Sequence, residues 1–265
     1  MQRVVELATD ECAAAGMAPL DVDTCWLRFG NAGRQELLTA HDLDCGLVYA
    51  DPPEAEAASV RERVDALGRR VGAGLRAAGF VFSPRARVGG NPEWWQPLSV
   101  WKARYTGWVR DPVRREIYPA RALFDLRGIC EPSPLLDNLR GHIASELNGN
   151  DAFIAVLAND TLANQPPLTF FHGLVIDEEE TESAHLDIVR SALQPLTDVG
   201  RVFALDQGAV WQTSTWERFD RAGITIASSR RSSARRPRRS GLRCSTVRAP
   251  VLAAVTTGRL STPPV

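Results

Sequence analysis

Apolar and polar positions repeat with two different periods along the chain, and the switches between them predict the elements of the fold. Residues 2 to 15 carry apolar side chains at helical spacing and end at Gly16, which predicts a short helix. Residues 25 to 29, Cys-Trp-Leu-Arg-Phe, are a compact β-prone run that ends at a glycine turn, residues 30 to 33. This stretch predicts a helix followed by a strand.

A second strand is expected soon after the glycine turn. Residues 34 to 40 contain good helix formers, and Asn31 is a favoured N-cap residue, so a short helix should begin close to Asn31. Residues 42 to 49 return to strand character until two prolines stop them. Strand, turn, helix and strand fit into about 25 residues, and such short connections suit an antiparallel or mixed sheet.

The middle of the chain predicts one long helix and several shorter elements. Residues 80 to 82 predict a strand, residues 98 to 109 a helix within a tryptophan-rich stretch, and residues 122 to 127 a strand that carries Asp125. The tryptophans are expected to pack in the core, with base stacking as the alternative. The long helix spans residues 54 to 79, with apolar side chains at three- and four-residue steps: Val60, Val64, Leu67, Val71 and Leu75.

Three segments are expected from these patterns. Residues 1 to 132 form an α+β domain, and residues 133 to 223 read as an α-helical bundle with loops near residues 148 to 150, 165 to 167 and 177 to 182. Residues 224 to 265 are rich in Arg, Ser and Pro and are expected to be disordered. This tail is either an arginine-rich arm for nucleic acid or an acidic partner, or the product of a frameshift in the coding sequence.

Composition narrows the class of protein. The apolar content of 44% supports a real hydrophobic core. No run of about 18 uncharged apolar residues occurs, and acids interrupt the first 16 residues, so a soluble cytoplasmic protein without a membrane segment is expected. The five cysteines are scattered without a CxxC pair, which argues against a disulfide framework or a zinc site and favours buried thiols.

The distribution of charge matters more than the net charge of −1. Residues 1 to 220 hold all 32 acidic residues and 21 of the 31 basic ones, a balance of −11. A body this acidic is a poor binder of long nucleic acid, so nucleic acid is expected only through the tail. Lys102 is the single lysine and a candidate for nucleotide binding, although coding bias towards arginine also explains its isolation.

A group of acids has the pattern that divalent cations require. Asp42 and Asp44 are two positions apart in a predicted strand, so their carboxylates share one face. Asp125, from a second strand, would complete a cluster of three. Two or three such carboxylates can fix the paired Mg²⁺ ions that support attack of a hydroxyl on a phosphate.

The glycine turn precedes this acid pair. Gly30 would let the backbone approach a phosphate closely, and Asn31 could donate its side-chain NH₂ to that phosphate. Arg34 could grip the phosphate with two N–H groups, and Glu36 is expected to orient Arg34 rather than to bind metal.

This ordered set resembles the nucleotidyltransferases commonly attached to pairs of CBS domains, relatives of the PII uridylyltransferase and the glutamine-synthetase adenylyltransferase. Their pattern is a GS-x-GR-x-E turn, a D-x-D strand, an aromatic-rich segment and an FDLR-like strand with the third acid. The resemblance covers roughly residues 20 to 223, and Asn31 stands where the family usually has serine. The matching residues are Gly30, Gly33, Arg34, Glu36, Asp42, Asp44, Trp94, Trp101, Trp108, Asp125 and Arg127.

The resemblance implies a polymerase-β-like nucleotidyltransferase sheet followed by a helical domain. It implies Mg²⁺, or Mn²⁺, at Asp42, Asp44 and Asp125, with a nucleoside triphosphate as substrate. The acceptor would be a protein or a small molecule, with a PII-like signalling protein or a CBS-domain protein as candidate partners. The nucleotide-binding residues would be Gly30, Asn31, Gly33, Arg34, Lys102 and Arg127.

Two further functions stay open at this stage. The chain could be a catalytically silent nucleotide-binding module in signal transduction, which the exchange of serine for Asn31 favours. It could also bind RNA through the arginine-rich tail.

Overall fold

The computed structural model describes residues 1–37, 43–82, 91–112, 120–163 and 193–223. The chain divides into two compact units, Met1–Asn150 and Asp151–Val265. Within the described ranges, none of the helices combines the length and the apolar character that crossing a bilayer demands.

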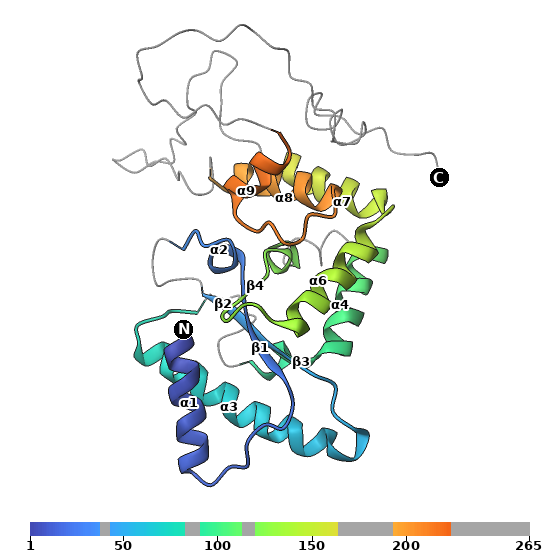
Figure 1. Ribbon diagram of the computed structural model, residues 1–265. Coiled ribbons are helices and arrows are strands. Elements are labelled where there is room, and N and C mark those ends of the chain that lie inside the picture. Colours follow the sequence, from blue (N-terminus) through green and yellow to red (C-terminus); the bar gives the residue numbers. More distant parts are fainter. Residues whose placement is uncertain (38–42, 83–90, 113–119, 164–192, 224–265) are drawn as a thin grey trace, which may run out of the picture. The chain divides into compact units, whose positions relative to one another are not determined.

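A four-stranded mixed sheet forms the centre of the first unit (Figure 1). The strands are β1 (Thr24–Phe29), β2 (Asp44–Tyr49), β3 (Trp95–Pro97) and β4 (Arg127–Gly128), in the order β3-β2-β1-β4. β1 pairs antiparallel with both β2 and β4, and β2 pairs parallel with β3. The expectation of an α+β fold with a mixed sheet is therefore confirmed.

Helices cover both faces of this sheet because its strands are apolar on both sides. On one face lies α3 (Ala57–Ala77), packed against α1 (Gln2–Ala14), and a Cβ on Gly68 would stand 2.5 Å from the Trp95 ring. On the other lie α4 (Leu98–Arg110) and α6 (Pro134–Leu147), and a Cβ on Gly46 would stand 3.3 Å from the Trp101 ring. The sheet is the middle of three layers.

Several predicted elements are confirmed. The helices expected over residues 2 to 15 and 98 to 109 correspond to α1 and α4. The long helix expected over residues 54 to 79 is a 3₁₀ turn, η1 (Glu54–Glu56), followed by α3. All five of its apolar positions are buried, as the spacing predicted: Val60, Val64, Leu67, Val71 and Leu75.

Three tryptophans of the tryptophan-rich stretch form core, as expected, and Trp108 is half-buried. Trp94, Trp95 and Trp101 are at most 5% exposed, and Trp101 Nε1 donates to the Leu47 carbonyl at 3.0 Å. Trp94 ends a 3₁₀ turn, η2 (Pro92–Trp94). This aromatic cluster fixes α4 against β2.

Two local predictions were wrong, and a third was right only in part. Residues 80 to 82 are not in a strand. Residues 122 to 127 do not form one strand. They belong to the 3₁₀ turn η3 (Arg121–Phe124), a bend at Asp125 and the start of β4, because the backbone changes direction here to approach the glycine turn. The helix expected to begin close to Asn31 does begin there, as α2 (Gly30–Gly33), but its N-cap is Phe29 and it ends at Gly33. Gln35, with a φ of 63°, stops the helix.

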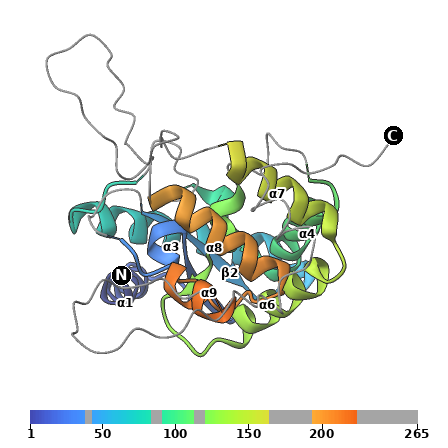
Figure 2. The same cartoon turned by 90° about the horizontal axis from the view of Figure 1, so that it is seen from above.

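The second unit is helical in its described parts, as expected (Figure 2). It contains α7 (Asp151–Ala163), α8 (Gln194–Asp206) and α9 (Thr215–Arg221), with α8 packed on both α7 and α9. A capping box between Ser214 and Glu217 starts α9. The loops predicted near residues 165 to 167 and 177 to 182, and the tail from residue 224, lie outside the described residues.

The boundary between the units lies later than the sequence suggested. We expected it near residue 132, but the first unit extends to Asn150. The reason is the packing of α6, which lies against α4 and the sheet. The Asn150 side chain also donates to the Val109 carbonyl at 2.7 Å and ties the loop after α6 to α4.

Candidate functional site

The glycine turn is α2, and glycine is favoured by the backbone conformation at Gly30 and required by the surroundings at Gly33. Gly30 has a φ of 54°, and a Cβ there would stand 3.8 Å from Asp44 Oδ2. A Cβ on Gly33 would lie 1.7 Å from the Asp125 carbonyl oxygen, far inside contact distance. The turn therefore has Asp44 near its start and the Asp125 backbone against its end.

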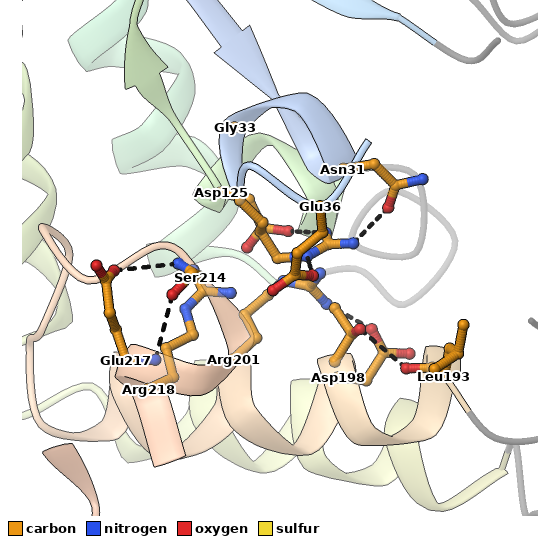
Figure 3. Close-up of polar contacts among 12 residues, drawn as sticks. Asn31, Gly33, Glu36, Asp125, Leu193, Asp198, Arg201, Ser214, Glu217 and Arg218 are labelled. Carbon is orange, nitrogen blue, oxygen red and sulfur yellow. Dashed lines mark hydrogen bonds and ion pairs between the residues drawn. The ribbon is translucent and has the colours of Figure 1, made fainter. Parts of the chain in front are cut away.

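Arg34, directly after α2, is held by three acceptors. Their side chains, labelled in Figure 3, belong to Asn31, Glu36 and Asp125. Its Nη1 donates to Asp125 Oδ2 at 2.6 Å and its Nε to Glu36 Oε2 at 2.7 Å. Its Nη2 donates to Asn31 Oδ1. The expectation that Glu36 orients Arg34 fits this geometry, and the guanidinium is fixed in one orientation.

Asp125 is fully buried, and its side chain is turned toward Arg34. It follows η3 and precedes β4, with φ −93° and ψ 51°, so it lies in a bend rather than in a strand. Tyr105 on α4 supports the same segment, because its hydroxyl donates to the Leu123 carbonyl at 2.7 Å. Burial raises the pKa of the Tyr105 hydroxyl, and the nearby Asp125 charge raises it further.

Asp44 is half-buried at the first position of β2, opposite the last residue of β1, Phe29. Burial raises the pKa of the neighbouring Cys45 thiol to about 12, and the Asp44 carboxylate adds to this effect. Asp125 comes just before β4, on the other side of β1. Asp44 and Asp125 thus belong to the same end of the sheet, on either side of the start of α2.

The remaining predicted site residues have different surroundings. Arg127 Nε donates to the Gly33 carbonyl at 3.2 Å, so Arg127 joins the end of the glycine turn. Lys102 lies on α4, where its carbonyl oxygen is 3.2 Å from His142 Nε2. Asp42 lies outside the described residues.

The ion pair between Arg34 and Asp125 was not predicted from the sequence. We assigned Arg34 to a phosphate and Asp125 to a metal, but not to each other. The two residues are 91 positions apart, and no local pattern reports such a contact. Tyr105 was missed as well, although its helical spacing from Trp101 marks it as a residue on the buried side of α4.

The donor set suits a hard cation only in part. In the portion of the chain that the structure describes, no three His, Cys, Asp or Glu side chains are close enough together to hold a metal ion. Asp44 offers the hard oxygen that Mg²⁺ prefers, and Gly30 leaves in front of it a space that a Cβ would fill. Asp125 offers the same chemistry, but its Oδ2 is engaged by Arg34.

Comparison with known families assigns this mixed sheet and its glycine turn to a class of nucleotidyltransferases. The profile of the family Putative nucleotidyltransferase DUF294 matches residues 1–115. That of the Putative nucleotidyltransferase substrate binding domain, DUF294_C, matches residues 151–235 and begins where the second unit begins. The chain belongs to this nucleotidyltransferase family. A search of curated proteins found no match.

Proposed function

We propose that this protein transfers a nucleoside monophosphate from a nucleoside triphosphate to a protein or small acceptor, with Mg²⁺ or Mn²⁺ as cofactor. The observation that carries the proposal is the fixed Arg34 guanidinium at the end of a glycine turn whose start lies beside Asp44. A positive group and a carboxylate on either side of one turn are the two features that a metal-bound triphosphate needs.

Charge supports a cation at this end of the sheet. Asp44, Asp125 and Glu36 carry three negative charges, and Arg34 and Arg127 supply two positive charges at the same turn. Carboxylates brought together without compensation disfavour one another's ionisation. A divalent cation at Asp44, with Asp42 as the expected second ligand, would balance the excess.

The residues of the turn would bind the phosphates. Gly30 leaves room for a phosphate oxygen to approach Asp44. Asn31 turns its carbonyl oxygen toward Arg34, so its NH₂ group is directed away and can donate to the ligand. Arg34 uses three of its five N–H donors in the contacts described, which leaves two for a phosphate.

Mg²⁺ bound at the acids would supply charge neutralisation at the attacking and leaving oxygens. The protein's own contribution is orientation. The Asp125 and Glu36 carboxylates hold Arg34 still, and Arg127 fixes the end of the turn through the Gly33 carbonyl. A donor that is already in place costs no reorganisation when charge develops on the phosphates.

The resemblance favours transfer of UMP or AMP, with a PII-like signalling protein as a candidate acceptor. Isothermal titration of the full chain with MgATP, MgUTP, MgGTP and MgCTP tests the first step, and we expect at least one to bind. Release of pyrophosphate in the presence of acceptors tests the second. If none of the four binds to wild-type protein, the proposal fails.

The Asp44→Asn variant tests the assignment of the metal site. It removes a ligand charge at constant volume, so metal-dependent turnover should be lost while the fold persists. Asp51→Asn is a matched control, because Asp51 is exposed and accepts its hydrogen bonds from the Ser99 N–H on α4, away from the turn. Full activity of Asp44→Asn would contradict the site.

A catalytically silent nucleotide-binding module is the second candidate. It is favoured by the ion pair in which Arg34 engages the third acid, Asp125. In that case a triphosphate binds to the wild-type chain, but no pyrophosphate appears with any acceptor. A binding isotherm combined with a sensitive pyrophosphate assay separates the two candidates.

A further inference from the structure

β1 and β4 run antiparallel, and their register can be followed beyond the end of β4. Gly128 pairs with Leu27. One step further, the Ile129 N–H donates to the Trp26 carbonyl at 2.8 Å, so the same pairing continues. The chain bends at residues 129 to 131, and the next step in this register would set one cysteine opposite another.

These cysteines are Cys25, in β1, and Cys130, directly after the last hydrogen bond of the ladder. Because the preceding position is hydrogen-bonded, theirs is a non-hydrogen-bonded position, where the Cα atoms of a regular ladder lie about 4.5 Å apart and both side chains leave on one face. A disulfide needs Cα atoms about 4.4–6.8 Å apart. A ladder continued to this position would meet the requirement of a disulfide, and closing the bond would break no hydrogen bond of the ladder.

The side-chain surroundings of Cys25 agree with this register. Burial raises the pKa of the Cys25 thiol, and a hydrogen bond with the Ser133 side chain partly offsets the rise. The thiol of Cys130 and the carboxylate of Glu131 also raise this pKa, so both groups lie within electrostatic reach of Cys25. The segment that begins at Cys130 therefore folds back beside the Cys25 side chain.

The two thiols differ in access to solvent. Cys25 is 5% exposed, whereas Cys130 is exposed. Cys12 and Cys45, the other cysteines in the described ranges, are buried. An oxidant in solution therefore reaches Cys130 first, and Cys25 is the neighbouring thiol that can react with the product.

We propose that Cys25 and Cys130 form a reversible intramolecular disulfide. A peroxide oxidises the Cys130 thiol to a sulfenic acid and is itself reduced, with release of one water. The Cys25 sulfur then attacks the Cys130 sulfur, the S–S bond forms, and the hydroxyl leaves with the Cys25 proton as a second water. The two thiols supply both electrons, and a dithiol reverses the reaction.

The bond would fasten β1 to the chain directly after β4. This strand pair leads, at its opposite end, into Gly30 on one strand and back to Asp125 on the other. A cross-link that closes a loop of about 100 residues lowers the entropy of the unfolded chain, so oxidation should raise the midpoint of thermal unfolding. The proposal is independent of the nucleotidyltransferase activity.

Peptide mapping of the full-length chain tests the proposal. The protein is reduced, freed of reductant, treated with hydrogen peroxide under native conditions, alkylated and digested without reduction. We expect one cross-linked pair of peptides containing Cys25 and Cys130, lighter by two hydrogens than the free pair and separated by dithiothreitol. Further oxidation of Cys130 with Cys25 still reduced would overturn the proposal, as would a link from Cys130 to Cys244.

Variants sharpen the result. In Cys130→Ser, Cys25 should stay reduced under the same peroxide treatment. In Cys25→Ala, the Cys130 sulfenic acid should persist and be trapped by dimedone. Cys12→Ser removes a buried thiol elsewhere and should leave the cross-link unchanged. If Cys25→Ala does not fold, the map of the wild-type chain and the Cys130→Ser variant decide.

Discussion

Arg34 Nη1 lies 2.6 Å from Asp125 Oδ2, and both side chains are buried. The contact joins the residue after the glycine turn to the residue before β4, which are 91 positions apart in the chain. It therefore fixes two segments of the candidate site relative to each other.

Removal of one partner from this ion pair should destabilise the protein strongly. Arg34→Gln leaves the Asp125 carboxylate without its guanidinium in a buried position, and such losses cost about 3–5 kcal/mol. Urea unfolding of the variant measures the change. Arg3→Gln, which breaks an exposed pair with Glu6, is the matched control and should unfold like the wild type.

A double-mutant cycle isolates the interaction free energy between Arg34 and Asp125. Arg34→Gln combined with Asp125→Asn removes both charges, so the loss should be smaller than the sum of the single losses. Strict additivity would show that the two side chains stabilise the fold independently, contrary to the observed contact.

Two glycine-to-alanine changes should have opposite effects on stability. Gly33→Ala places a Cβ 1.7 Å from the Asp125 carbonyl oxygen, and backbone cannot yield as a flexible side chain can. We expect a loss of at least about 1–3 kcal/mol, measured by urea unfolding. Gly107→Ala, on α4 with open space around it, should instead stabilise by about 0.5–1 kcal/mol. An unchanged midpoint for Gly33→Ala would contradict the close approach.

Gly30→Ala should weaken ligand binding, and the loss of stability in this variant should not by itself account for the weaker binding. Gly30 and Gly16 both have positive φ, so an alanine at either position costs about 1–3 kcal/mol in backbone strain. Only the Gly30 variant adds a methyl group beside Asp44 Oδ2. Titration with Mg²⁺-triphosphate should therefore show weaker binding for Gly30→Ala and unchanged binding for Gly16→Ala. Equal affinities would remove Gly30 from the site.

Glu131 should make stability depend on pH in the acid range. Burial opposes its charge, but the Gly128 N–H at 2.8 Å and the Arg140 guanidinium at 3.0 Å outweigh burial and hold its pKa below the ordinary value of 4.5. A lowered pKa in the folded state stabilises the protein above pH 4.5, and this contribution is lost as the pH falls through the folded-state pKa.

Comparison with Glu131→Gln measures this contribution. At pH 7 the wild type should be the more stable protein in urea unfolding, because its carboxylate is ionised and bound to Arg140. The difference should shrink as the pH falls below 4.5. A difference that is constant between pH 3 and pH 7 would mean that the charge of Glu131 does not contribute.

Local sequence predicted most of the fold because each long element carries its own signal. Burial of one face of a helix or strand repeats apolar residues within that element alone. The apolar spacing of α3 and the β-prone run of β1 are such patterns, and each can be read without knowledge of the rest of the fold. The elements that were misplaced are short. η3 and β4 together span eight residues, from Arg121 to Gly128, and no periodicity develops over such a length.

The order of residues in the chain determined which side chains were available at the site, since GNAGRQE, DLD and FDLR are visible as motifs. Only the tertiary structure decided which of them meet. Arg34 engages Asp125 rather than standing free, and Gly33 is required by the Asp125 carbonyl, because packing of the sheet and its helices brings distant backbone to the turn. Contacts between residues so far apart depend on the whole fold, and no pattern within one segment contains them.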